Sequence, residues 1–173
     1  ESGLNDWDFD WDVVTNDMTL YAKWEINQYT VKFDSNGGSV VEPQTVNFDT
    51  PIEKPETSFV GHTLKAWYSD ESLTKEWDFS NPVKENLTLY AKWELNQYKV
   101  KFNTDRPDVI EDVIVAHGEK LTQPTDPIKE HYSFVGWYTD DTFKTEWDFS
   151  QEIIEDTTLF AKWDIDRFTI IFE

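Results

Sequence analysis

Apolar and polar side chains alternate over several short stretches of the chain. Residues 29–33 and 98–102 both read apolar, polar, apolar, polar, apolar. Residues 89–93 place a leucine, an alanine and a tryptophan on one side and a tyrosine and a lysine on the other. A period of two is typical of β-strands, because successive side chains of a strand point to opposite faces of the sheet. We therefore predict short strands, each with one face in contact with solvent.

Turn-forming residues follow two of these strands. Asn-Gly-Gly at residues 36–38 tolerates positive φ, which predicts a hairpin leading into a strand near residues 44–48. Asp-Arg-Pro-Asp at residues 105–108 follows the strand at residues 98–102 in the same way. Because the two turns differ in sequence while the strands agree, the turns are expected to belong to a scaffold and not to a functional site.

Four further segments carry weak strand signals. Residues 51–55 and 121–127 each contain two prolines. Proline fixes φ and lacks an N–H, so each segment is predicted to form a short helical turn or an irregular crossover. Residues 70–76 and 140–146 begin with acidic side chains, which favour a helix N-terminus or an Asx-type turn. We expect at most one turn of helix there.

The sequence repeats itself at an offset of 70 residues. Trp-Asp-Phe at residues 77–79 returns at residues 147–149, and the pattern of residues 89–93 returns at residues 159–163. The order of the motifs is the same in both copies. Such self-similarity is the signature of a tandem array of small modules.

The repeats predict four segments. Residues 1–27 match the C-terminal half of a preceding repeat, 28–96 and 97–165 are full repeats, and 166–173 resemble the start of a following one. We expect the chain to be part of a longer array. If the folding unit is permuted relative to the repeat, the half copies at both ends belong to other modules. Isolated half copies would leave tryptophans such as Trp11 without a core.

Tryptophan is the main candidate for the core of each repeat. A unit of about 70 residues is near the size at which hydrophobic cores become marginal. Burial of one aromatic side chain contributes on the order of 4–6 kcal/mol as an upper bound. The alternative role for such rings is stacking on carbohydrate at an exposed surface. We predict that the repeated tryptophans form the cores, namely Trp67, Trp77, Trp93, Trp137, Trp147 and Trp163.

Charge and composition exclude several classes of partner. The chain has 35 Asp and Glu against 15 Lys and Arg, a net charge of −20. This field repels phosphate backbones and anionic headgroups, so we expect no nucleic-acid partner and no direct membrane insertion. No apolar run approaches the ~20 residues that span a bilayer. The absence of cysteine excludes disulfides and thiolate metal sites. A monomer is expected.

No catalytic site is predicted. His62, His117 and His131 lie in unrelated sequence contexts, and none recurs at the same place in both repeats. Neither a His-Glu-x-x-His motif nor a nucleophile elbow occurs. Lone surface histidines are the expected reading. We therefore expect no enzymatic activity, no cofactor and no catalytic residue.

Four alternating aspartates form the one pattern that suggests a metal. Asp6, Asp8, Asp10 and Asp12 have the spacing of a calcium loop, but Trp11 occupies the position where that loop needs glycine. A strand with an acidic outer face and an aromatic inner face explains the pattern better. No metal site is predicted.

Several motifs in fixed order resemble a known family, the internalin-type B repeat, also called the Listeria-Bacteroides repeat. The matching segments of the first full repeat are residues 29–33, 36–38, 61–68, 77–79 and 87–93. Departures are Lys65-Ala66, where the family favours a small residue and glycine, the missing Asn-Gly-Gly turn in the second repeat, and one extra residue between Phe9 and Leu20. The resemblance implies a mainly β or α+β fold, with tandem β-grasp-like (ubiquitin-like) modules, each having a four-stranded sheet and little helix. It also implies a secreted or cell-wall-attached bacterial surface protein.

Two functions remain open from the sequence. The joints between repeats, such as residues 94–97, contain neither glycine nor proline, which favours restricted modules in an elongated chain. A structural spacer is therefore expected. The alternative is an adhesion module that binds a host-surface protein or glycan through an exposed sheet edge or aromatic patch.

Overall fold

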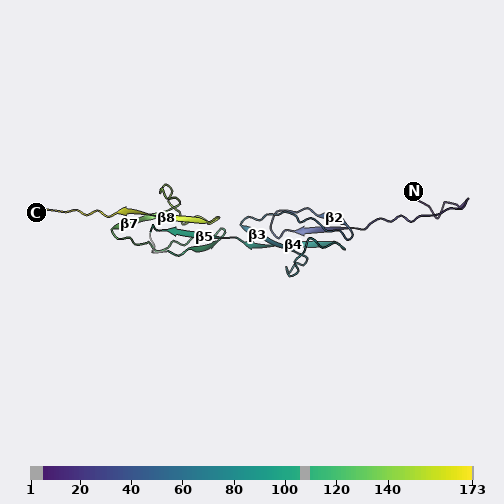
Figure 1. Cartoon of the computed structure of the whole chain (residues 1–173), viewed down its shortest axis with the longest axis horizontal. Helices are drawn as coiled ribbons and strands as arrows, with labels where there is room; N and C mark the ends of the chain where they lie inside the picture. Colours follow the sequence, from purple (N-terminus) through teal and green to yellow (C-terminus); the bar gives the residue numbers. More distant parts are fainter. Residues whose placement is uncertain (1–5, 106–109, 173) are drawn as a thin grey trace.

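The computed structural model, which describes residues 6–105 and 110–172, contains two four-stranded sheets in tandem (Figure 1). The strands of the first sheet are β1 (Gln28–Asp34), β2 (Gln44–Asn47), β3 (His62–Tyr68) and β4 (Leu87–Leu95). The strands of the second sheet are β5 (Gln97–Asn103), β6 (Val113–Ala116), β7 (Tyr132–Tyr138) and β8 (Thr157–Ile165). We call the units that contain these sheets the first module and the second module.

Both sheets have the same strand order. The first is ordered β2-β1-β4-β3 and the second β6-β5-β8-β7. The two central strands of each sheet are parallel, with Val31 opposite Leu87 and Val100 opposite Thr157, and the outer pairs are antiparallel. The prediction of a mainly β fold with four-stranded sheets is confirmed. The described residues contain no helix, so the α+β alternative is not realised, and the β-grasp assignment stays a prediction.

The first strand ends where the sequence predicts a hairpin. Asn36 and Gly37 have φ of 46° and 93°, and the Gly38 N–H donates to the Ser35 carbonyl over 3.0 Å. Both φ values lie in the left-handed region, which asparagine and glycine adopt most readily. In the second module Asp105 has φ of 57° at the equivalent position, and the rest of the predicted turn at 105–108 lies outside the described residues.

Each core is closed on one side by long loops. In the first module Val31, Leu89 and Trp67 come from the sheet, and Ile52 and Val83 come from the loops that cross it. The Val83 N–H donates to the Thr50 carbonyl over 2.9 Å, which ties one loop to the other. The second core is built from equivalent residues, namely Val100, Leu159, Trp137, Leu121 and Ile153. The loops therefore do the covering that helices do in larger α+β domains.

The segments with weak strand signals are irregular. Residues 51–55 and 121–127 contain neither helix nor strand, so the irregular crossover is the alternative that the structure confirms. Residues 70–76 form a tight loop, because the Ser69 N–H donates to the Lys75 carbonyl and Tyr68 bridges Glu76. The segment is therefore a non-helical turn, and the single turn of helix that the sequence analysis considered does not form.

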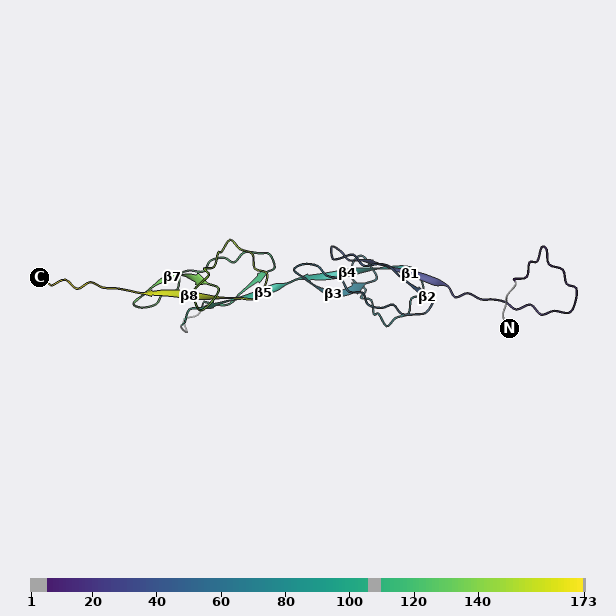
Figure 2. The same ribbon diagram turned by 90° about the horizontal axis from the view of Figure 1, so that it is seen from above.

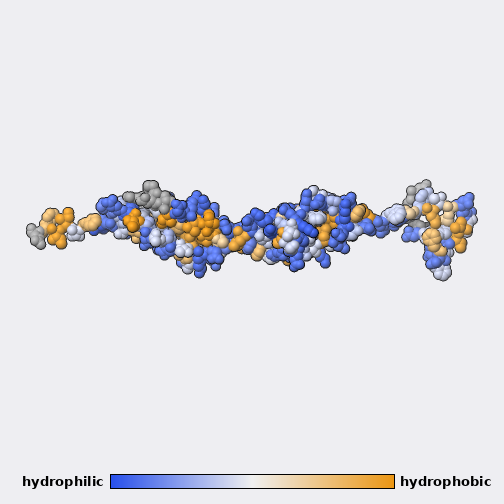
Figure 3. Space-filling model, turned by 90° about the horizontal axis from the view of Figure 1, so that it is seen from below, coloured by the Kyte–Doolittle hydropathy of each residue, from blue (hydrophilic) through white to orange (hydrophobic). Residues whose placement is uncertain are grey.

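The half repeats at both ends form no strand among residues 6–27 and 166–172. Trp11 and Trp24 are 83% and 89% exposed, and Phe172 is 89% exposed. Figure 3 shows hydrophobic side chains on the surface at both ends of the molecule. The strand predicted at residues 6–12 is wrong, because residues 9–11 form a turn, as do residues 79–80 and 149–150 at the equivalent places of the two complete modules.

The two modules lie end to end (Figures 1 and 2). β4 ends at Leu95 and β5 begins at Gln97, so Asn96 alone separates the last strand of the first module from the first strand of the second. No helix in the described part of the chain is long and apolar enough to span a bilayer. The tandem, elongated arrangement is confirmed.

Replacement of Trp67 by alanine tests whether the modules fold independently. Trp67 lies in the core of the first module, and no buried residue is shared between the two cores. We expect Trp67→Ala to destabilise the first module by about 3–5 kcal/mol. Amide NMR spectra should then lose the β1–β4 signals and keep those of β5–β8, with Trp137→Ala giving the mirror result. Simultaneous loss of both sets would show that the modules fold as one unit.

Candidate functional site

The repeated tryptophans face the cores. Trp67 and Trp137 are each 1% exposed. Trp67 meets Phe33 edge-on with ring centroids 5.2 Å apart, and Trp137 meets Phe102 in the same way at 5.0 Å. The prediction that these two rings point inward is confirmed.

The other four repeated tryptophans are half-buried against the cores. Trp93 donates from Nε1 to the Ser35 carbonyl over 2.7 Å, and Trp163 donates to the Thr104 carbonyl over 3.3 Å. These bonds attach each indole to the loop that follows the first strand of its module. None of the six repeated tryptophans is exposed, so they do not form the open stacking platform that carbohydrate binding requires.

The three histidines have different surroundings. His62 stacks on Phe59 with centroids 4.1 Å apart, and His131 occupies an exposed turn with φ of 67°. His117 lies at the joint between the modules, where its Nδ1 is buried without a hydrogen-bond partner among the described residues. The prediction of a lone surface histidine is therefore wrong for His117. It was missed because the contact that encloses its ring comes from the other module.

The alternating aspartates at the N-terminus form a local turn. The Asp10 N–H donates to Asp8 Oδ1 over 2.8 Å, and Ser80 and Ser150 donate in the same way to Asp78 and Asp148. An Asx turn of this kind needs only neighbouring residues, so it forms even in the half repeat. No group of three or more His, Asp or Glu side chains in the described part of the chain is placed to hold a metal ion.

Asp70 and Asp140 organise the loop after the third strand of each module. Asp70 accepts hydrogen bonds from the hydroxyls of Ser72 and Thr74 and from the backbone N–H groups of Thr74 and Lys75. The prediction of turn residues is confirmed. These bonds, led by that from Ser72, lower the pKa of Asp70 well below its usual range. The pKa of Asp140 is lowered chiefly by the hydroxyl of Thr142.

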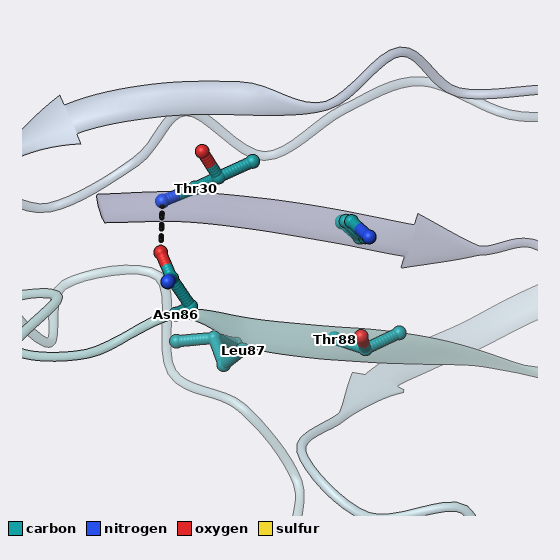
Figure 4. A pocket seen from close by; sticks show the side chains of 5 residues that line it. Thr30, Asn86, Leu87 and Thr88 are labelled. Atoms are coloured by element: carbon teal, nitrogen blue, oxygen red, sulfur yellow. Dashed lines mark hydrogen bonds between the residues drawn. The ribbon is translucent and has the colours of Figure 1, made fainter. Parts of the chain in front are cut away.

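The open face of the first sheet carries a shallow hollow of about 470 Å³ (Figure 4). The Thr30 N–H donates to Asn86 Oδ1 over 2.7 Å beside this hollow, and the backbone N–H of Lys99 donates to Asp156 Oδ1 over 2.9 Å at the equivalent place. Asn86 and Asp156 therefore satisfy a backbone donor near the start of the central strand. Their recurrence reflects architecture and not chemistry.

Two further hollows lie elsewhere. One of about 220 Å³ lies beside Trp137, Glu146 and Trp147 in the second module. The other, about 610 Å³, lies at the joint and includes Leu95 and Tyr98. Among the described residues that line them, the hydroxyls of Thr30 and Thr63 bond to Thr45 and Asn96 and not to a lysine, histidine or carboxylate. A nucleophile bonded to a base is the minimum constellation for nucleophilic catalysis.

Three strongly exposed apolar side chains of the described modules have no apolar equivalent in the other repeat. Val60, Ile128 and Ile154 are each more than half exposed, and their equivalents in the other repeat are polar or charged. Leu95 and Ile165 are an equivalent pair, 44% and 62% exposed, and both lie at the end of the last strand of a module. One surface feature that recurs in both modules thus lies at the end of the last strand.

A second recurring feature lies on the open face of each sheet. The Lys92 ammonium lies 5.3 Å from the centroid of the Tyr68 ring, and Lys162 lies 4.9 Å from that of Tyr138. Each lysine covers a tyrosine that would otherwise face solvent. The pairing is a cation–π contact of the kind that stabilises exposed sheet faces modestly.

Comparison with known proteins shows which family the sequence matches. The model of the Listeria-Bacteroides repeat domain matches residues 1–23, 29–92 and 98–162. Two proteins of Evansella cellulosilytica, named as a membrane protein and a Gly-rich membrane protein, are 46% and 43% identical over 159 and 169 residues. These alignments cover 90% and 96% of this chain.

A third relative comes from Listeria monocytogenes. Internalin H is 32% identical over 125 residues, which is 70% of this chain. The chain spans 24%, 20% and 22% of the length of these three relatives.

Removal of the two loop aspartates tests their structural role. Because their pKa values are lower in the folded state, their bonds stabilise the fold fully above the unfolded pKa near 3.8, and this stabilisation is lost as the pH falls below that value. We expect Asp70→Ala/Asp140→Ala to melt a few degrees below the wild type at pH 7. The gap should shrink between pH 4 and pH 2. Thermal unfolding monitored by circular dichroism measures this difference in melting temperature. A difference that does not change with pH would contradict the structural role of the two aspartates.

Proposed function

The chain belongs to the Listeria-Bacteroides repeat domain family, and from this we propose that it is a non-enzymatic structural spacer in a bacterial surface protein. The protein is secreted or attached to the cell wall, and the modules hold other parts of it away from the cell. The relatives named as membrane proteins and as an internalin support a place at the cell surface.

The observation that carries this proposal is the end-to-end arrangement of two modules whose separate cores are built from equivalent residues and whose surfaces differ. The buried positions agree, as in the pairs Trp67 and Trp137 or Leu89 and Leu159. The exposed positions differ, as in Val60 and Glu130. A repeated binding site would instead require equivalent exposed residues.

The charge of the chain suits a spacer. A net charge of −20 keeps neighbouring copies apart and favours a soluble monomer. It also disfavours nucleic acid and anionic lipid as partners. The array is therefore proposed to act alone, through its length.

An adhesion module is the second candidate, with a host-surface protein or glycan as its partner. The recurring pairs of Lys92 with Tyr68 and Lys162 with Tyr138 favour it, because they lie at equivalent places on open sheet faces. The lysines cover the rings, however, which reduces the aromatic area available to a ligand. The spacer is for this reason the stronger proposal.

Small-angle X-ray scattering tests the spacer. We expect a pair-distance distribution with one peak at the module width and a long tail, as for a rod. The tail should persist at low and high salt, because the length of the molecule is set by the end-to-end order of the modules along the chain and not by charge repulsion alone. A compact globular profile would exclude a spacer.

Binding assays test the adhesion module. A glycan array and a pull-down from host membranes are probed with the wild type and with the Lys92→Glu/Lys162→Glu variant. We expect equal, background signal from both proteins. Specific binding by the wild type that the variant loses would replace the spacer proposal with adhesion.

A further inference from the structure

Asn96 is hydrogen-bonded to both modules. Its N–H donates to the Gly61 carbonyl in the first module over 2.8 Å, and its carbonyl accepts from the His117 N–H in the second over 2.9 Å. Its side-chain Oδ1 also accepts from Thr63 Oγ1 over 2.7 Å. The peptide groups on both sides of this single connecting residue are therefore held in place, which limits rotation about its φ and ψ.

The ring of His117 packs directly against Gly61. A Cβ placed on Gly61 would lie 2.1 Å from Cδ2 and 2.5 Å from Cγ of that ring, far inside van der Waals contact. The same ring meets Tyr98, with centroids 5.9 Å apart. The turn of the first module and the first strand of the second thus enclose the ring together.

The hydrogen-bonded frame of this joint recurs, but the glycine does not. Asp166 donates to the His131 carbonyl over 2.9 Å as Asn96 does to Gly61. Gly61 has φ of 73° and His131 has φ of 67°, so the two turns have the same backbone shape. His131 shows that this turn accepts a histidine when no ring packs against it. Gly61 is therefore needed for the contact between modules and not for the turn.

We propose that the Gly61 turn and the His117 ring form a docking interface that holds the two modules at one fixed relative orientation. Its partners are two parts of the same chain, and Gly61 is the residue that makes their close approach possible. The interface is a property of the joint, and it holds whether the array serves as a spacer or as an adhesin.

Distance measurements between spin labels test the interface. The chain has no cysteine, so labels at Lys32→Cys and Lys101→Cys are unique. Both lysines are exposed and lie at equivalent places on central strands, β1 and β5. Double electron–electron resonance on the full chain should give one narrow distance distribution. A broad distribution in the otherwise wild-type chain would overturn the proposal.

Gly61→His is the decisive variant, because the second module already folds with histidine in the same turn. The added side chain collides with His117, so we expect the distance distribution to widen at least twofold. Amide NMR should show both modules still folded. A distribution as narrow as the wild type would overturn the proposal. If the first module unfolds, Gly61→Ala introduces the same collision with one methyl group, and the same two outcomes apply.

Gly118→Ala is the matched control. Gly118 also has a left-handed backbone, with φ of 80°, but nothing lies within 4 Å of a Cβ placed there. The substitution therefore adds similar backbone strain without a collision. We expect its distance distribution to match that of the wild type. Equal widening by Gly118→Ala and Gly61→His would show that strain, and not the contact with His117, controls the orientation.

Discussion

The parallel pairing of β1 with β4 determines the rest of the architecture. The first and last strands of a module lie side by side and run in the same direction, so the chain enters at one end of the sheet and leaves at the other. An antiparallel pairing of the same two strands would return the chain to its entry point and fold an array back on itself. Because β5 and β8 pair in the same way, each module passes the chain onward along one axis. The elongated form in Figure 1 is a consequence of this parallel pairing.

The same pairing explains why half a repeat does not fold. β1 and β4 are separated by more than fifty residues, so the central contact forms only when the whole module is present. Trp24 and Trp93 occupy equivalent positions in the sequence repeat. Trp93 lies opposite Leu64 in the β3–β4 pair and packs against a complete core, while Trp24 is 89% exposed because its half repeat has no first strand beside it. The tryptophans therefore stabilise the sheet only when its first and last strands are both present and paired.

Local patterns were predictable from the sequence, and neighbours across the sheet were not. Alternation located β1 and β4 because a period of two depends only on the strand itself. It does not say which strands are adjacent, so the parallel centre had to come from the structure. The turn at Asp8 was predicted to be a strand, because aspartates that alternate with aromatic residues are compatible with a strand as well as with a turn. The contact of His117 with Gly61 joins residues of different modules, and no local signal marks either partner.

The joint is built from groups that suit a highly acidic chain. Gly61, Thr63, Asn96 and Tyr98 are uncharged, and the modules are joined by hydrogen bonds through Asn96 and by packing of the His117 ring against Gly61. Repulsion between two acidic modules acts over roughly 10 Å at 0.1 M salt and weakens further as salt rises. Short-range contacts of this kind do not depend on that screening. An interface made of ion pairs would loosen as salt increased, whereas this one keeps its geometry while the repulsion that opposes docking declines. The orientation of the modules is therefore set by packing at one glycine, and the charge serves to keep the array extended and apart from other copies.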